Sequence, residues 1–116
     1  MISIQIILLL LATHWIADFI LQSDYFAKNK SSDNTILGLH VLTYIIPFAL
    51  LGFIIPITPE WLLVNFIAHY ITDYNTSRLT KKLWELKEVH WFFVVIGLDQ
   101  LAHYAVLFST YYWLVL

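Results

Sequence analysis

The chain has 116 residues, of which 60% are apolar and only 12% are charged, and its formal net charge is −2. Because so few charges cannot cover the surface of a soluble domain of this size, the composition predicts a single domain in contact with lipid. The absence of cysteine excludes disulfides and cysteine-ligated zinc, and the slightly acidic balance argues against nucleic-acid binding.

Four apolar segments follow one another, and each is close to the roughly 20 residues that cross a bilayer as a helix. The expected spans are about residues 3–22, 35–55, 59–75 and 89–116. We do not interpret the first segment as a signal peptide, because it lacks a basic start and a small-residue cleavage site and carries Asp18. Thr58 before Pro59 is typical of a helix start. Residues 76–88 are expected to extend the third helix along the membrane surface.

The basic residues indicate an orientation. They lie in the connections between the first and second and between the third and fourth spans, at Lys28, Lys30, Arg78, Lys81, Lys82 and Lys87. The opposite side has no lysine or arginine. The positive-inside rule therefore predicts cytoplasmic basic loops and both termini outside. For residues 76–88 we favour anchoring to anionic headgroups over substrate capture.

Two pairs of segments resemble each other in the same order along the chain. "HWIADF" (14–19) matches "HYITDY" (69–74) at three identical and two aromatic positions, and "LGLHVLTY" (37–44) matches "IGLDQLAH" (96–103) at three. The sequence therefore predicts an all-α integral membrane four-helix bundle in one domain, 1–116. It would consist of two tandem helical hairpins related by a pseudo-twofold axis along the membrane normal.

Each span also carries ionisable residues. The candidate metal ligands are His14, Asp18, His40, His69, Asp73, Asp99 and His103. The histidine–aspartate pairs are four residues apart, so each pair shares one helix face. At 1.5 Å per residue, most of the seven lie roughly 6–15 Å from the cytoplasmic end of their spans. Isolated carboxylates in lipid cost about 2.5–3.5 kcal/mol each, so protons, imidazolium or a bound cation must neutralise them.

Four histidines beside three aspartates are a typical ligand set for a divalent transition metal, with zinc the first choice. Seven groups exceed one tetrahedral ion, so either two ions bind or some aspartates orient the histidines. Asp18, Asp73 and Asp99 are also the candidate catalytic residues, one of them as a general base. The simpler alternative is a set of interhelical hydrogen bonds that only hold the bundle together.

The sequence His14-x3-Asp18-Phe19-x-Leu21-Gln22-x-Asp24-x2-Ala27-x2-Lys30 resembles the signature of small bacterial membrane proteins known as domain of unknown function 3307. The resemblance extends over nearly the whole chain, to His40, His69-x3-Asp73 and Asp99-Gln100-x2-His103. It implies a four-helix fold in the bacterial inner membrane and no particular activity. More loosely, the pattern is similar to predicted membrane-bound metal-dependent hydrolases.

Four further residues are candidates for contact with the metal ligands or a substrate. Gln22 and Asp24 come from the resemblance and lie at the cytoplasmic end of the first helix, where helix termination is the simpler role. Asn65 precedes His69 by one turn, and Gln100 follows Asp99.

The expected function is that of a membrane-embedded hydrolase with one or two divalent ions, acting on a lipid-linked or amphiphilic (phospho)ester at the cytoplasmic leaflet. The alternative is a subunit of a proton- or cation-coupled transporter that uses the same Asp/His cluster. A b-type haem protein is disfavoured because haem needs no carboxylate beside its histidines, and a purely structural membrane protein is the last alternative. The expected partner is the lipid bilayer, and the sequence leaves open whether the chain also associates with further copies of itself.

Overall fold

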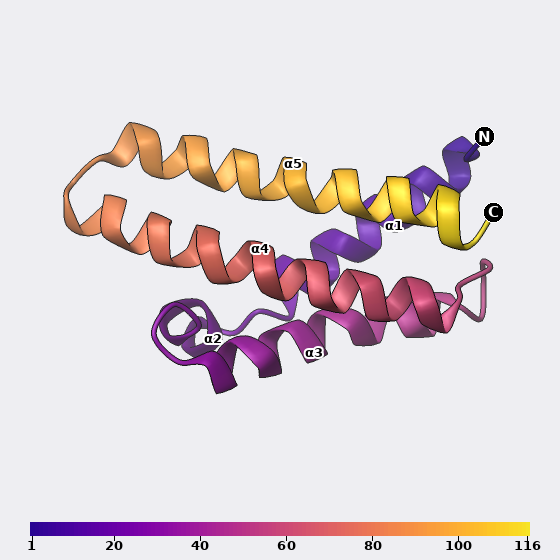
Figure 1. Ribbon diagram of the computed structural model, residues 1–116, viewed down its shortest axis with the longest axis horizontal. Helices are drawn as coiled ribbons and strands as arrows, with labels where there is room; N and C mark the ends of the chain where they lie inside the picture. Colours follow the sequence, from indigo (N-terminus) through magenta and orange to yellow (C-terminus); the bar gives the residue numbers. More distant parts are fainter.

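A computed structural model describes residues 1–116 and contains helices and no strands, as expected (Figure 1). The elements are α1 (Ile4–Trp15), the π-helix η1 (Ile16–Ile20), α2 (Asp24–Asn29), α3 (Asn34–Leu51), α4 (Pro59–Glu85) and α5 (Val89–Leu114). Both termini lie at one end of the molecule, and α2 and the α4–α5 connection lie at the other. A helix occupies each of the four expected segments, and residues 76–85 continue the third as predicted.

Short polar side chains begin four of the helices. Ser3, Ser23 and Asp33 accept hydrogen bonds from the first-turn N–H groups of α1, α2 and α3. Thr58 does the same for Trp61, with proline at the first position of α4, so the start predicted there is confirmed. α2 was not expected, because six residues are too few for a periodic signal. Its N-cap at Ser23 is the one local indication of a helix in this connection.

The end of the first helix is wound more loosely than the α-helix assumed from the sequence. In η1 the N–H of Leu21 donates to the carbonyl of Ile16, five residues earlier. Such π-turns are rare and are found frequently at functional sites. Here the turn places Ala17 and Asp18 in the interior, where they are 0% and 5% exposed.

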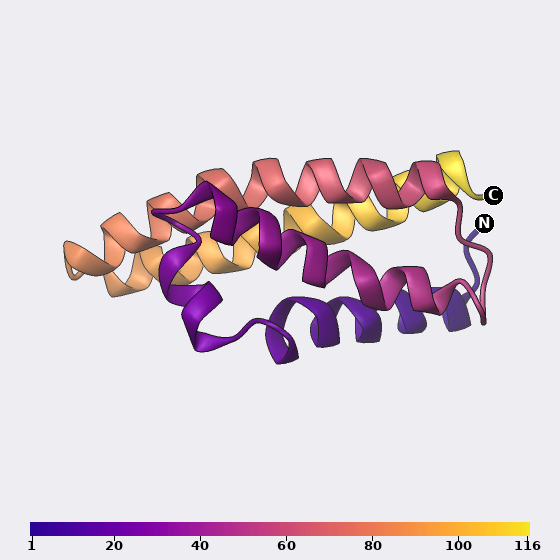
Figure 2. The same ribbon diagram turned by 90° about the horizontal axis from the view of Figure 1, so that it is seen from below.

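The helices pack as an antiparallel bundle in which α4 lies between α3 and α5 (Figures 1 and 2). α1 packs on α3 and touches α5, and η1 packs on α3. An apolar core fills the end near the termini, with Tyr44, Phe48, Trp61 and Tyr111 all buried. The Trp61 indole donates to the carbonyl of Leu107, which joins α4 to α5 within this core.

The interior is unusually polar and the exterior unusually apolar. Ten of the 22 buried residues are polar or charged, whereas Leu42, Leu63, Ile67 and Leu101 are at least 49% exposed. Two helices, α3 and α5, are long and apolar enough to cross a membrane by length and composition. The apolar run Ile4–Ile20 is shorter, and the second half of α4 carries charges. Two of the four expected spans thus meet this criterion.

Candidate metal centre

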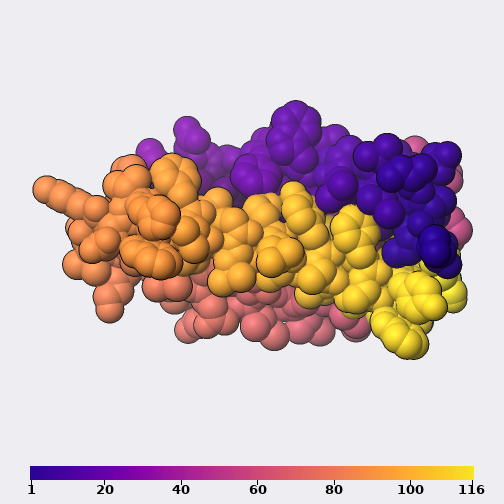
Figure 3. Space-filling model, turned by 90° about the horizontal axis from the view of Figure 1, so that it is seen from above, coloured from indigo at the N-terminus to yellow at the C-terminus, as the bar shows by residue number.

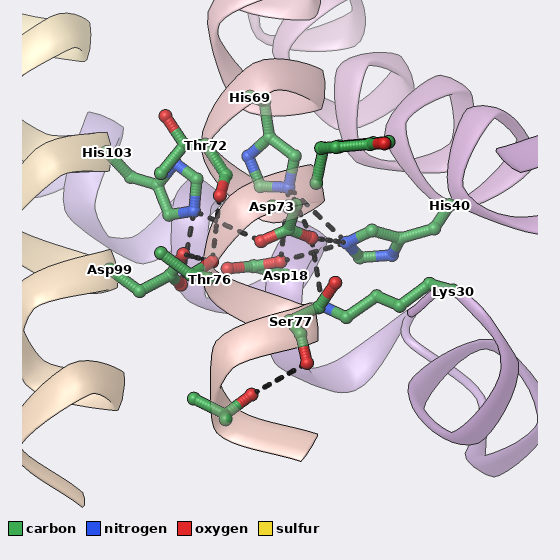
Figure 4. Close-up of polar contacts among 12 residues, drawn as sticks. Asp18, Lys30, His40, His69, Thr72, Asp73, Thr76, Ser77, Asp99 and His103 are labelled. Carbon is green, nitrogen blue, oxygen red and sulfur yellow. Dashed lines mark hydrogen bonds and ion pairs between the residues drawn. The ribbon is translucent and has the colours of Figure 1, made fainter. Parts of the chain in front are cut away.

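The structure brings most of the predicted histidines and aspartates to one place in the middle of the bundle (Figure 4). Asp18 comes from η1, His40 from α3, His69 and Asp73 from α4, and Asp99 and His103 from α5. All six are at least 92% buried. Side chains from four segments of the chain therefore converge, as their common depth predicted.

Four ligand atoms of this cluster are arranged as a metal ion requires. His40 Nε2 lies 3.3 Å from His69 Nε2, 3.2 Å from Asp18 Oδ1 and 3.1 Å from Asp73 Oδ2. His69 Nε2 lies 3.6 and 3.4 Å from the same two oxygens. For metal–ligand distances of about 2.0–2.2 Å, the edges of a tetrahedral zinc site measure about 3.3–3.6 Å. Three of the five distances fall within this range and the other two are 0.1–0.2 Å shorter, so this buried group could hold a metal ion.

A second group lies next to the first. Asp18, Asp99 and His103 also bring ligand atoms within 4.8 Å of one another. His103 Nε2 is 3.2 Å from Asp99 Oδ2 and 3.5 Å from Asp73 Oδ1. Because the other oxygen of Asp73 faces His40 and His69, this carboxylate lies between the two groups. Asp18 is shared by both.

His14, a predicted ligand, lies beside these two groups and has other partners. Its Nε2 is 2.8 Å from Gln100 Oε1, and its Nδ1 is 2.9 Å from the Tyr44 hydroxyl. The Gln100 amide nitrogen donates to Asp99 Oδ2 at 3.1 Å, which turns its oxygen toward His14. Nε2 therefore carries the proton of a neutral ring and Nδ1 accepts from Tyr44. Both ring nitrogens are engaged, and the nearest carboxylate, Asp18, is 3.7 Å away.

The remaining candidates take different places. Gln100 links His14 to Asp99. Gln22 lines the cavity beside the cluster, with its Oε1 buried and without a partner. Asp24 is exposed in the first turn of α2, where it suits the helix start. Asn65 donates to the Trp61 carbonyl and the Thr110 hydroxyl, so it joins α4 to α5 away from the carboxylates.

The second ring nitrogens of two histidines lack partners. Nδ1 of His40 and Nδ1 of His69 are buried without a hydrogen bond. Ligation through Nε2 places the ring proton on Nδ1, where metal-binding histidines usually donate to a protein group. An unmade bond of this kind costs about 1–3 kcal/mol. The positions of the four ligand atoms favour a metal ion. The two Nδ1 protons without hydrogen-bond partners lower the affinity that this site would have for the ion.

A cavity of about 660 Å³ leads to the cluster from the end of the bundle that holds α2. Asp73 and Asp99 line its inner part, together with Thr76. The Thr76 hydroxyl lies 2.6 Å from Asp99 Oδ1 and fixes the position of that carboxylate. The cluster is therefore accessible from one side, while the apolar core closes the bundle on the side of the termini.

Comparison with known proteins places the chain in a family. Residues 6–116 match the family described as Protein of unknown function (DUF3307). The chain belongs to this family. No curated protein and no solved structure matches it. Since the DUF3307 description assigns no activity, the functional argument depends on the site itself.

The DUF3307-like signature in this chain ends in Lys30, whose role the sequence analysis missed. Lys30 Nζ lies 2.8 Å from Asp73 Oδ2, and its side chain is only 15% exposed. The sequence predicts this lysine in a loop outside the spans, and its position in the signature is the one signal of a role in the site. Three carboxylates and one ammonium leave two net negative charges when the histidines are neutral. One divalent cation or two imidazolium rings would balance them.

Proposed function

We propose that this DUF3307 protein is a membrane-embedded, metal-dependent hydrolase that cleaves an ester or phosphoester bond. The observation that carries the proposal is the convergence of His40 Nε2, His69 Nε2, Asp18 Oδ1 and Asp73 Oδ2 within 4.8 Å of one another, in a buried cluster open to a cavity. A divalent ion would balance the charge of the cluster, and the nitrogen and oxygen ligands suit zinc.

The membrane location is supported by the reversed distribution of polarity. A soluble protein buries mainly apolar side chains, whereas here many large apolar side chains are exposed and ten of the 22 buried residues are polar or charged. α5, with 26 residues, is about 39 Å long, enough for a hydrocarbon core of about 30 Å. We propose that α1 with η1, α3, the first part of α4 and α5 form the four spans, with the termini outside and the basic connections in the cytoplasm.

This topology is testable because the chain contains no cysteine. Single cysteines at Glu60, near the termini, and at Lys87, in the α4–α5 connection, should react with a membrane-impermeant maleimide from opposite sides of intact cells and inverted vesicles. Labelling of both positions from the same side would contradict a membrane-spanning α4–α5 hairpin.

The residues of the site suit hydrolysis. When bound, a divalent ion polarises the substrate and activates water at neutral pH. Asp99 lines the cavity and is held by the Thr76 hydroxyl and the Gln100 amide, so it is placed to accept a proton. The Lys30 ammonium beside Asp73 is placed to stabilise negative charge that develops on the substrate. With a second ion, Asp99 and His103 would be ligands instead.

Metal content and hydrolysis in detergent-purified protein test the proposal together. Wild type should retain one or two zinc ions per chain and hydrolyse a chromogenic phosphodiester or ester. Asp73→Asn should lose both properties, and Asp24→Asn, which removes an exposed carboxylate, should lose neither. Asp99→Asn should keep one ion and lose hydrolysis. Less than about 0.3 ion per chain in wild type after gentle purification would overturn the metal site.

The transporter alternative has less support. The buried rings of Tyr44, Phe48, Trp61 and Tyr111 fill the bundle between the cluster and the termini, so a single chain offers no polar path across. Cation flux in proteoliposomes that Asp73→Asn abolishes would favour transport over hydrolysis.

A further inference from the structure

The cavity beside the cluster has a polar side along one stripe of α4. Asp73, Ser77 and Lys81 follow one another at four-residue spacing, and all three line the cavity. Thr80 and Trp84 continue the lining to the end of the helix. Residues this far apart share one helix face, so the stripe runs from the metal centre to the end of α4. Beyond Asp73, the stripe lies in residues 76–88, for which the sequence favours headgroup anchoring over substrate capture.

The middle of this stripe offers donors without partners. The Ser77 hydroxyl is buried and makes no hydrogen bond, although the residue is only 8% exposed. Lys81 lies one turn further along α4, and Lys28 of α2 lines the same cavity. A hydroxyl and two ammonium groups are the donors that bind a phosphate or similar anion.

Carboxylates also line the cavity, and those of its inner end have partners within the cluster. Asp73 pairs with Lys30 at 2.8 Å, and Asp99 lies 3.2 Å from His103 Nε2 and accepts from Thr76. Glu85 is exposed at the outer end of α4. Lys28 and Lys81 therefore supply positive charge on the part of the lining that includes Ser77, whereas Asp73 and Asp99 belong to the metal centre.

The opposite side of the cavity is apolar. Phe92, Phe93 and Ile96 of α5 line it together with Trp84. The Trp84 and Phe92 rings are 5.1 Å apart, and Trp84 and Phe93 remain 58% and 61% exposed. This end of the α4–α5 hairpin projects beyond the other helices in the space-filling view (Figure 3). Exposed aromatic rings beside an anion-binding zone suit a ligand that has an apolar chain and a charged head.

We infer that this cavity binds an amphiphile with a phosphate-type headgroup and an apolar chain. Lys28, Lys81 and Ser77 hold the headgroup, and the chain lies against Trp84 and the two phenylalanines of α5. The inference deepens the proposed hydrolase by naming its substrate class. It rests on that proposal only for the statement that a bond of the bound amphiphile faces the metal centre and is cleaved there. Binding of the amphiphile itself requires no metal.

Photoaffinity labelling of the full chain in detergent tests the inference. The probe is dodecyl phosphate with a diazirine in its chain, applied to protein stripped of metal with a chelator. Mass spectrometry should place the label within residues 84–96. Unlabelled dodecyl phosphate should compete, whereas dodecanol and inorganic phosphate at the same concentration should not.

Two neighbouring lysines provide a matched pair of variants. Lys81 lines the cavity and Lys82 does not, so Lys81→Gln and Lys82→Gln change the net charge equally. Lys81→Gln should raise the half-saturating probe concentration about tenfold, as loss of a charge-assisted hydrogen bond does. Lys82→Gln should change it less than about twofold. Ser77→Ala should weaken labelling severalfold.

Equal effects of the two lysine variants would overturn the headgroup site. Equal competition by dodecanol would show a purely apolar groove, and equal competition by inorganic phosphate would show a soluble ligand; either result contradicts an amphiphile. Because the protein is metal-free, labelling is independent of the hydrolase proposal. Zinc binding and hydrolysis without specific labelling would remove only this inference.

Discussion

The two histidines of the repeated His-x3-Asp pattern should respond differently to the same substitution. Sequence similarity makes His14 and His69 equivalent, but their surroundings differ. His69 Nε2 faces His40 Nε2, Asp18 Oδ1 and Asp73 Oδ2 at 3.3–3.6 Å. The ring nitrogens of His14 are instead bonded to Tyr44 and Gln100. We therefore expect His69→Gln to remove a metal ligand and His14→Gln to remove a supporting hydrogen bond.

The expected magnitudes follow from the geometry. Four-ligand zinc sites bind with about 10–16 kcal/mol, so one ligand contributes about 2.5–4 kcal/mol. Loss of His69 should therefore weaken zinc binding about 100- to 1000-fold. His14 reaches the carboxylates only through Gln100, since its own nearest carboxylate oxygen is 3.7 Å away. Its loss should cost about tenfold or less, at the lower end of the effect of outer partners.

Zinc affinity can be measured in detergent by competition with a chromophoric chelator. His40→Gln should behave like His69→Gln, since its Nε2 belongs to the same four atoms. Thermal unfolding of each metal-free variant provides the control, because a misfolded bundle would lose zinc for another reason. Equal losses of affinity in folded His14→Gln and His69→Gln would refute the assignment of ligands.

Other substitutions probe the ion pair and the helix ends. Lys30→Met should lower the free energy of unfolding of the metal-free protein by about 1–3 kcal/mol, because the Asp73 carboxylate loses its ammonium partner. The same substitution should raise zinc affinity severalfold, because it removes a positive charge beside the ion. Weaker zinc binding by this variant would contradict the second expectation. Lys87→Gly should stabilise the protein by about 1 kcal/mol, because Lys87 has φ 58°, whereas Lys82→Gly within α4 should destabilise it about equally. Thr58→Ala should cost about 1 kcal/mol through loss of the N-cap of α4, and Thr58→Asn should restore it. Denaturant titration in micelles measures all of these free energies, and an unchanged midpoint for Lys87→Gly or Thr58→Ala would contradict the local geometry on which each prediction depends.

Much of the helical framework could be predicted from local chemistry. A helix in an apolar segment of about 20 residues depends on residues that are neighbours in the chain, and so does the helix start at Thr58–Pro59. The structure places helices in these segments. α2 and η1 could not be predicted, since six residues carry no reliable period and nothing in the sequence of η1 marks a wider turn. The four membrane spans and their orientation stay predictions for the labelling experiment.

The sequence by itself indicated that the histidines and aspartates of the apolar segments are buried, because such a side chain in an apolar helix must be satisfied inside the bundle. Only the tertiary structure decided what each one does. His14 differs in role from His69 because its ring nitrogens are bonded to Tyr44 and Gln100, which lie 30 and 86 residues away along the chain. Lys30 reaches Asp73 across 43 residues. Ligand geometry depends on such distant contacts, and two copies of one local pattern can therefore form two different parts of the site.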